Sequence, residues 1–258
     1  MSLDKIDDYF IFIYDLEPSE WCSTFRFESP NFHRADLAHT ASFSLWKNML
    51  VVFYAIPSGA YPFDVLRARV QYFATIIVTC YGWLTGKPLE LIQKNWVEVE
   101  TEGQVRKRIA GTFQNISEPP IEHPDNEAFK KIVTLVPLNL KNPELARALR
   151  DFHSCLSKTN PDFYFYAYRA VEDIRSYFGS AEDDNERRKA WDSMNKALGR
   201  EQKDYKELVE LAKQARHGNI PDLLIDQETA QRQVNFVSSL INVFTKFLSD
   251  SDNARTGV

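Results

Sequence analysis

The fold of this chain can be worked out from residues 160–179, NPDFYFYAYRAVEDIRSYFG. Asn160 and Pro161 are the typical start of a helix, an N-cap residue followed by proline in the first turn. Apolar side chains then recur at the 3.6-residue period of an α-helix, at Phe163, Ala167, Ala170, Ile174 and Phe178. Gly179 follows and is a good C-terminal stop. The stretch therefore predicts an amphipathic helix with one buried face.

More helices are expected around this stretch, from Asn142 onward. Asn142 and Pro143 repeat the start signal and predict a helix to about Ser157. Two helices are predicted over about 186–198 and 201–216, ended by Gly199 and Gly218, and a last one after the capping residue Asp226. Their expected inward side chains are Trp191, Met194 and Leu198; Tyr205, Leu208, Ala212 and Ala215; and Val234, Val237, Ile241, Phe244 and Leu248. Short loops favour antiparallel neighbours, so we predict an antiparallel helical bundle over 141–250 and a disordered tail over 251–258.

Before Asn142 the chain consists mostly of short extended runs. Strong strand signals cover residues 9–14, 49–54 and 95–100, and weaker ones cover 107–113 and 132–136. One helix is expected over about 62–81, and its apolar stretch is shorter than the ~20 residues that cross a bilayer. We therefore predict a mixed α/β domain over 1–140 and the α+β fold class for the whole chain, with no membrane association.

Composition excludes several classes of protein. The 258 residues are 44% hydrophobic and 26% charged, which argues against disorder, collagen and a coiled-coil rod. The net charge of −5 arises before residue 128, where the balance is −6, whereas residues 128–258 carry +1. Three widely spaced cysteines form no Cys-x-x-Cys pair, so a cytoplasmic protein with reduced thiols is expected.

Standard catalytic motifs are absent from the sequence, but two polar segments could carry chemistry. The polar face of the 160–179 helix holds Tyr168, Arg169 and Glu172, and a second segment ends in Lys213, Arg216 and His217. His217 is a candidate general acid/base, because histidine titrates near neutrality, and Arg216 and Lys213 are candidate phosphate ligands. The alternatives are a solvated helix face with local ion pairs and a cationic helix C-cap.

The order of these features resembles the HEPN superfamily over about residues 161–248. The features that carry the resemblance are the Tyr168–Glu172 helix, the Trp191 helix and the Lys213–Gly218 turn before a last amphipathic helix. The resemblance implies a helical bundle from a prokaryotic defence or stress system, antiviral defence included. It also implies a metal-independent ribonuclease that uses an Arg, four to six residues and a His at a symmetric dimer interface. His217 would be that histidine, but Glu210, Leu211 and Ala212 occupy the positions expected for the arginine.

The sequence leaves two functions open. The first is a HEPN-like endoribonuclease without metal or other cofactor, in which His217 and Arg216 are catalytic and Lys213, Arg169, Glu172 and Tyr168 bind the RNA substrate. The second is a non-catalytic module for protein–protein interaction or dimerisation, which the missing arginine spacing and the many aromatic residues favour. In both cases the helical domain is expected to form a homodimer or bind a protein partner.

Overall fold

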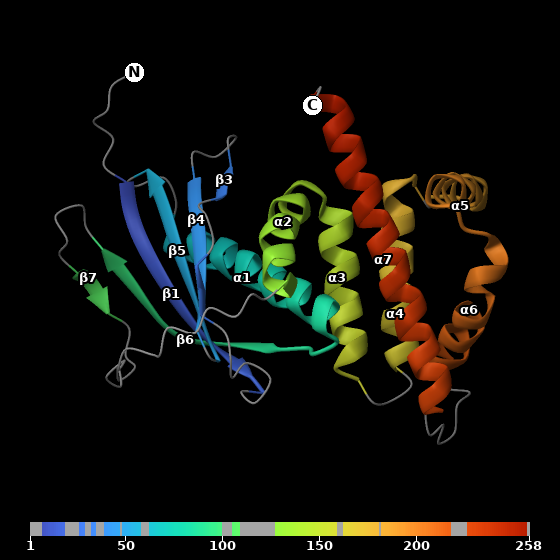
Figure 1. Ribbon diagram of the computed structural model, residues 1–258, viewed down its shortest axis with the longest axis horizontal. Helices are drawn as coiled ribbons and strands as arrows, with labels where there is room; N and C mark the ends of the chain where they lie inside the picture. Colours follow the sequence, from blue (N-terminus) through green and yellow to red (C-terminus); the bar gives the residue numbers. More distant parts are fainter. Residues whose placement is uncertain are drawn as a thin grey trace. The chain divides into compact units, whose positions relative to one another are not determined.

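The computed structural model describes residues 7–18, 26–28, 32–34, 39–46, 48–57, 62–99, 105–108, 127–158, 162–180, 182–217 and 226–256. The chain divides into two compact units (Figure 1). The sheet unit contains Met1–Val78 and Leu89–Thr134, and the helical unit contains Thr79–Pro88 and Leu135–Val258. The α+β class predicted from the sequence is confirmed, with strands in the N-terminal part and helices in the C-terminal part.

The strands of the sheet unit form one antiparallel sheet in the order β2-β4-β5-β1-β6-β7, and β3 also pairs with β4. The strands are β1 (Asp7–Glu17), β2 (Arg26–Glu28), β3 (Phe32–Arg34), β4 (His39–Trp46), β5 (Met49–Pro57), β6 (Glu90–Val99) and β7 (Val105–Arg108). β1 is central and pairs with β5 on one side and β6 on the other. The three strong strand predictions correspond to these three paired strands.

Alternation along β1 explains how the sheet acquires its buried face. Phe12, Tyr14 and Leu16 are at most 1% exposed and lie two residues apart, so their side chains leave the same face. Helix α1 (Phe63–Thr85) packs its first part against this unit, with the Phe63 ring stacked on Phe12 at 6.4 Å. The apolar run of α1 is therefore a core helix, as the sequence predicts, and no described helix is long and apolar enough to cross a membrane.

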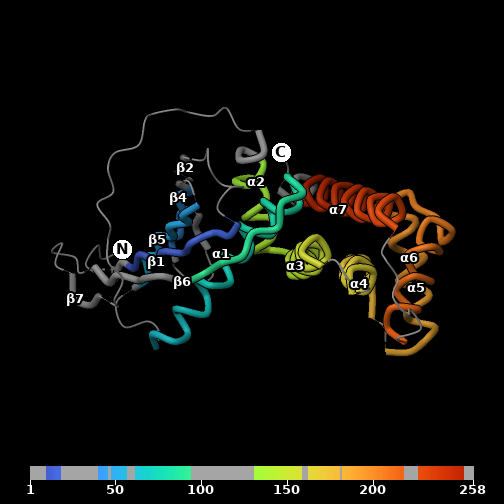
Figure 2. The backbone as a smooth tube through the Cα atoms, turned by 90° about the horizontal axis from the view of Figure 1, so that it is seen from below, coloured from blue at the N-terminus to red at the C-terminus, as the bar shows by residue number. Residues whose placement is uncertain are grey.

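The helical unit is built from the end of α1, the second part of α2 and, among the described residues, the five helices that follow. Their bounds are α2 (Glu127–Lys141), α3 (Pro143–Leu156), α4 (Asp162–Tyr177), α5 (Asp184–Leu198), α6 (Gln202–Arg216) and α7 (Gln227–Thr256). α4 contacts α3, α5, α6 and α7. Figure 2 shows α4 between α3 on one side and α5 and α6 on the other. Residues on α4 can therefore meet side chains from both sides.

The predicted inward faces of these helices are largely confirmed. Leu208, Met194, Val237, Ile241 and Phe244 are fully buried, whereas Trp191, Ala215 and Val234 are only half-buried. Helices also begin and end at residues that the sequence predicted as start and stop signals. Asp226 accepts hydrogen bonds from the backbone of Glu228 and Thr229, and Gly199 ends α5 in the left-handed conformation at φ +61°.

Two local predictions from the sequence are wrong. Residues 132–136, predicted as a weak strand, lie inside α2, whose apolar residues are buried on a helical rather than an alternating period. α7 continues to Thr256, past the predicted start of the disordered tail at 251, and the hydroxyls of Ser249 and Ser251 donate to backbone carbonyls four residues earlier. The predicted signals at Asn160, Gly218 and residues 109–113 lie outside the described residues.

Candidate functional site

The six residues predicted to form a site come from two helices that pack together. Tyr168, Arg169 and Glu172 lie on α4, and Lys213 and Arg216 lie in the last turn of α6, followed by His217. α4 buries Phe163, Ala167, Ala170 and Ile174, whereas Tyr168, Arg169 and Glu172 lie between these positions and are half-buried. The α4–α6 contact brings the two predicted segments into one region of the helical unit.

Arg169 and Arg216 meet at the ring of Phe165. The guanidinium carbon of Arg169 lies 5.6 Å from the centre of the Phe165 ring, and that of Arg216 lies 5.4 Å from the same centre. Arg169 also lies 6.0 Å from the ring of Tyr166. Both distances to Phe165 are in the range of cation–π attraction, so one ring contacts a cation from each of two helices. We call Phe165, Arg169 and Arg216 the arginine cluster.

Tyr168 and Glu172 form a second pair beside the arginine cluster. The pKa of Tyr168 is raised to about 12, mainly by burial and also by the charge and hydrogen bond of Glu172, against the opposing effect of Arg175 and Arg216. Tyr168 is therefore protonated at neutral pH and acts as the donor to the Glu172 carboxylate. The two residues lie four positions apart on α4, and Arg216 lies close enough for its charge to act on the hydroxyl.

His217 and Lys213 have little support from neighbouring side chains. Both are exposed, and within the described part of the chain neither side chain makes a hydrogen bond. The backbone N–H of His217 donates to the carbonyl of Lys213, which ends α6. The structure thus brings Arg216 and Arg169 to the same ring, and it leaves the side chain of His217 exposed at the adjacent helix end.

A buried charge network lies behind the arginine cluster, between α3 and α4. Arg169 Nε is 2.9 Å from Oδ2 of Asp151, whose side chain is only 4% exposed. Burial raises the pKa of Asp151 to about 6; Arg169 opposes this shift, and the neighbouring carboxylate of Asp173 adds to it. Asp173 accepts a hydrogen bond of 3.1 Å from Nε of Arg147. The sequence did not predict a role for Asp151, because the apolar periodicity of a helix does not show which of its charged side chains becomes buried.

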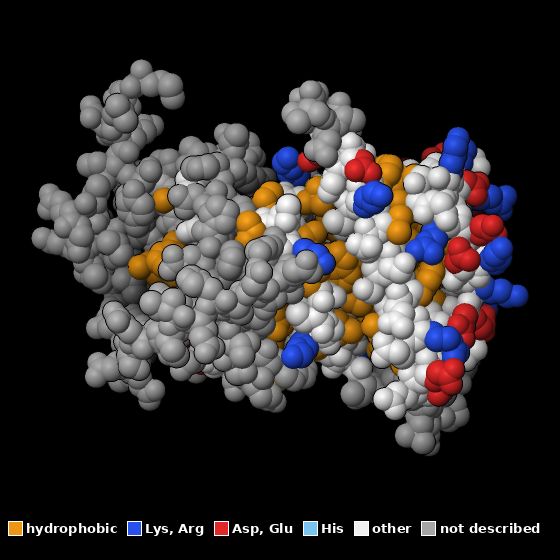
Figure 3. Space-filling model, viewed as in Figure 1, with side chains coloured by type: hydrophobic (Ala, Val, Ile, Leu, Met, Phe, Trp, Pro, Cys, Tyr) orange, Lys and Arg blue, Asp and Glu red, His pale blue; other side chains and the backbone are white. Residues whose placement is uncertain are grey.

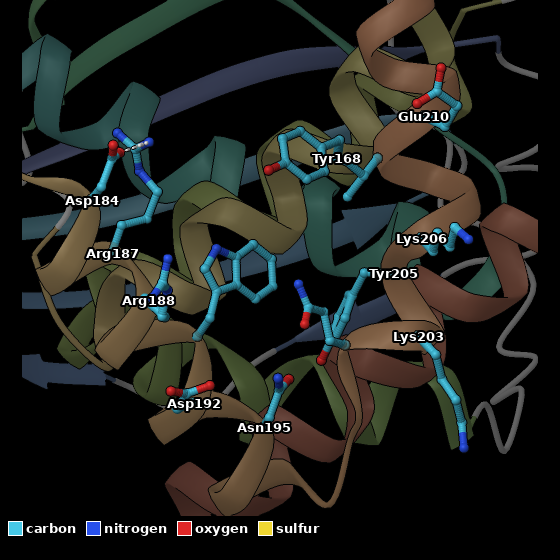
Figure 4. Close-up of a pocket in the computed structure, with 13 residues that line it drawn as sticks. Tyr168, Asp184, Arg187, Arg188, Asp192, Asn195, Lys203, Tyr205, Lys206 and Glu210 are labelled. Carbon is cyan, nitrogen blue, oxygen red and sulfur yellow. Dashed lines mark hydrogen bonds and ion pairs between the residues drawn. The ribbon is translucent and has the colours of Figure 1, made fainter.

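An open groove of about 940 Å³ lies between α4, α5 and α6, and the sequence did not predict it (Figure 4). We call it the α4–α6 groove. Three aromatic side chains line it: Tyr168, Trp191 and Tyr205. Trp191 was predicted to be a core residue, but it is half-buried and meets Tyr205 edge-on at 5.2 Å. Tyr168 belongs both to this groove and to the Glu172 pair, so the groove adjoins the arginine cluster.

Charges of both signs line the α4–α6 groove. The cations are Arg187, Arg188, Lys203 and Lys206, and the acids are Asp184, Asp192 and Glu210. Arg187 pairs with Asp184 at 3.1 Å, and Lys203 pairs with Glu201 outside the groove. Figure 3 shows cations and acids interspersed over this end of the helical unit. Among the described residues Arg188 and Lys206 have no ion-pair partner, so they are the cations available to a ligand.

Neither metal ligation nor thiol chemistry is indicated in the described part of the chain. No group of three or more His, Cys, Asp or Glu side chains there is placed to hold a metal ion. Cys80 and Cys155 are buried free thiols, and burial raises the pKa of both well above its usual value. They are therefore poor nucleophiles at neutral pH.

Residues 129–249 match a protein family described as the C-terminal domain of a domain of unknown function, DUF8168. The match runs from α2 to α7 and so includes the arginine cluster and the α4–α6 groove. Comparison with curated proteins and with solved structures gives no match.

Proposed function

We propose that the helical unit binds RNA at the arginine cluster and cleaves it without a metal ion, as the HEPN resemblance implies. One observation carries the proposal. Arg169 and Arg216 come from different helices and lie over the same aromatic ring, next to an exposed histidine. Two guanidinium groups beside one ring suit the binding of a phosphate, because each can donate two parallel hydrogen bonds.

The roles of the predicted residues follow from this placement. His217 removes the proton from a ribose 2′-hydroxyl or donates one to the leaving 5′-oxygen. The 2′-oxygen then attacks the phosphorus while the bond from phosphorus to the 5′-oxygen breaks. Arg216 and Lys213 neutralise the developing charge on the phosphate. Arg169 takes the place of the missing motif arginine, and Tyr168 with Glu172 supports this side of the cluster.

The charge network supports the role of Arg169. A flexible arginine loses side-chain entropy when it binds a ligand, and this loss is smaller when the side chain is already held. The ion pair with Asp151 and the Phe165 ring hold Arg169 from two sides. Its side chain is nevertheless 41% exposed, so a phosphate can reach it.

The test is a cleavage assay on a labelled single-stranded RNA in the presence of a metal chelator. His217→Ala is expected to reduce the rate constant at least ~100-fold, the usual contribution of a general acid or base. Arg216→Ala and Arg169→Ala are expected to weaken RNA binding as well as cleavage. Lys246→Ala, at an exposed position of α7, removes a cation elsewhere and is the matched control.

Attack by the 2′-oxygen predicts two further readouts. The products must end in a 2′,3′-cyclic phosphate and a 5′-hydroxyl, and a substrate with a single 2′-deoxyribose at the scissile position must resist cleavage. A parent protein that does not cleave RNA, or a His217→Ala variant with unchanged activity, would contradict the catalytic proposal.

The second function, a non-catalytic interaction module, predicts different results. Size-exclusion chromatography with light scattering would then show a dimer, stable in high salt, that has no affinity for RNA. Phosphate contacts are strongly weakened by salt, so salt dependence separates the two functions. A dimer that also binds and cleaves RNA would support the first function, because the HEPN resemblance implies a dimeric site. From the same resemblance we propose that the protein acts in prokaryotic defence or stress, in the cytoplasm.

A further inference from the structure

We infer that the α4–α6 groove binds a nucleotide, with the base stacked on its aromatic side chains and the phosphate held by Arg188. The ligand is either a free nucleotide or an unpaired residue of an RNA strand, which present the same chemistry. In the second case the inference rests on the proposed function, since the groove would then hold part of the RNA substrate.

Aromatic lining is the first reason. Trp191 is half-buried, so part of its indole surface is open to the groove, and its edge-on contact with Tyr205 fixes the ring. Tyr205 is itself held edge-on by Phe236 at 5.5 Å. A rigid indole is a good stacking surface for a base, because stacking is not offset by loss of side-chain freedom. The volume of about 940 Å³ is large enough for a nucleotide.

Two buried polar atoms on residues that line the groove lack hydrogen-bond partners among the described residues. They are Oδ1 of Asn195 and the hydroxyl of Tyr205, a residue that is only 3% exposed. Buried polar atoms without partners cost free energy, so they are uncommon unless a ligand or water satisfies them. Burial raises the pKa of Tyr205 to about 12, so its hydroxyl remains a donor. The groove lining therefore contains an unpaired acceptor on Asn195 and an unpaired donor on Tyr205, both covered from solvent, and a base edge carries both kinds of complementary group.

Charge placement is the third reason. In Figure 4, α5 supplies Arg188 and Asn195 on one side of the groove, α6 supplies Tyr205 on the other, and Tyr168 lies between them. Glu210 and Lys203 point away from the centre. Arg188 is exposed and without an ion-pair partner in the described part of the chain, so it can bind a phosphate without breaking an existing pair.

Binding is tested with the full chain by fluorescence anisotropy of a labelled single-stranded oligoadenylate. Trp191→Ala is expected to weaken binding at least ~10-fold, because base–aromatic stacking is worth about 1–3 kcal/mol. Trp191→Phe keeps an aromatic ring and is expected to retain most of the affinity. Arg188→Ala is expected to weaken binding and to reduce its salt dependence.

Two controls are matched to these variants. Lys189→Ala removes an exposed cation from the same helix, outside the groove, and Tyr72→Ala removes an exposed aromatic ring from α1. Both are expected to bind as the wild type does. Circular dichroism of each variant checks that the fold is retained.

Competitors identify the source of the nucleotide. Competition by AMP indicates a free nucleotide, whereas binding of the oligonucleotide without competition by AMP indicates an RNA residue. Inorganic pyrophosphate that competes as well as AMP does would overturn the inference, because the base would then contribute nothing. Equal binding by wild type, Trp191→Ala and Arg188→Ala would overturn it as well.

Failure here is separable from failure of the proposed function. If His217→Ala and Arg216→Ala impair cleavage while the groove variants behave as wild type, the groove inference fails and the proposed function stands. If the groove variants lose AMP binding and the parent protein cleaves no RNA, the catalytic proposal fails and the groove inference stands.

Discussion

The carboxyl group of Asp151 makes the stability of the helical unit depend on pH in an unusual direction. Burial raises its pKa from an ordinary value of 3.8 to about 6, with Asp173 adding to the shift and Arg169 opposing it. The folded state therefore binds this proton more tightly than the unfolded state does. The resulting stabilisation is complete below about pH 4 and is lost as the pH rises through about 6.

The size of the effect follows from the shift. A shift of about two pKa units corresponds to roughly 3 kcal/mol of stabilisation well below pH 4. By the linkage relation, about 1 kcal/mol of this stabilisation is gained when the pH falls from 7 to 5. Most other carboxylates act in the opposite direction, so the effect has to be isolated by comparison with a variant.

Asp151→Asn isolates it, because the neutral amide resembles the protonated carboxyl and does not titrate. Unfolding by urea, followed by circular dichroism, gives the free energy of unfolding of the wild type and the variant at pH 5 and pH 7. The stability of the wild type relative to the variant is expected to increase by about 1 kcal/mol from pH 7 to pH 5. Glu182→Gln, at an exposed position after α4, is the control and should show a much smaller change.

Two outcomes would refute this reasoning. One is a relative stability that does not change between the two pH values, and the other is a wild type that gains relative stability as the pH rises. Asp173→Asn provides a second check, because removal of that carboxylate should lower the pKa of Asp151 and move the transition to lower pH.

Two glycines give further predictions. Gly82→Ala is expected to destabilise the helical unit by roughly 1–2 kcal/mol despite its position in a helix, because a Cβ there would lie 2.8 Å from Cδ2 of His153. Thermal unfolding measures this loss of stability. The loss should be smaller in a His153→Ala background. If Gly82→Ala is instead stabilising, the ring of His153 moves aside freely. Gly199→Ala is expected to cost about 1 kcal/mol because its φ is +61°. No atom lies within 4 Å of the added Cβ, so the loss has a backbone origin and Gly199→Asn should cost less.

Much of the fold was predictable because its signals are local. Asp226, Gly199 and the periodic apolar residues of α4 act within one or two turns of the chain, and the structure uses them as predicted. Residues 132–136 show the limit of this approach. A run of five residues with four apolar side chains fits a strand or a helix equally well, and only packing within α2 decides between them.

The candidate site was predictable only in part. The i,i+4 spacing of Tyr168 and Glu172 is local, and so is the position of Arg216 and His217 at a helix end. Which arginine meets which ring is a matter of helix packing. Phe165 and Arg216 are far apart in sequence, and no local signal predicts that their side chains meet. The same holds for the burial of Asp151 and for its pairing with Arg169.

By itself, the sequence determined the α+β class and the helices of the C-terminal half, and it named the candidate residues of the proposed function. These properties depend on composition and on spacings of three or four residues. The tertiary structure alone decided that Arg169 and Arg216 share one ring, that Asp151 is buried, and that Trp191 opens into a groove. The physical reason is that burial and pairing between helices depend on how distant segments pack, and this packing sets both the charge of a carboxyl group and the access to an aromatic face.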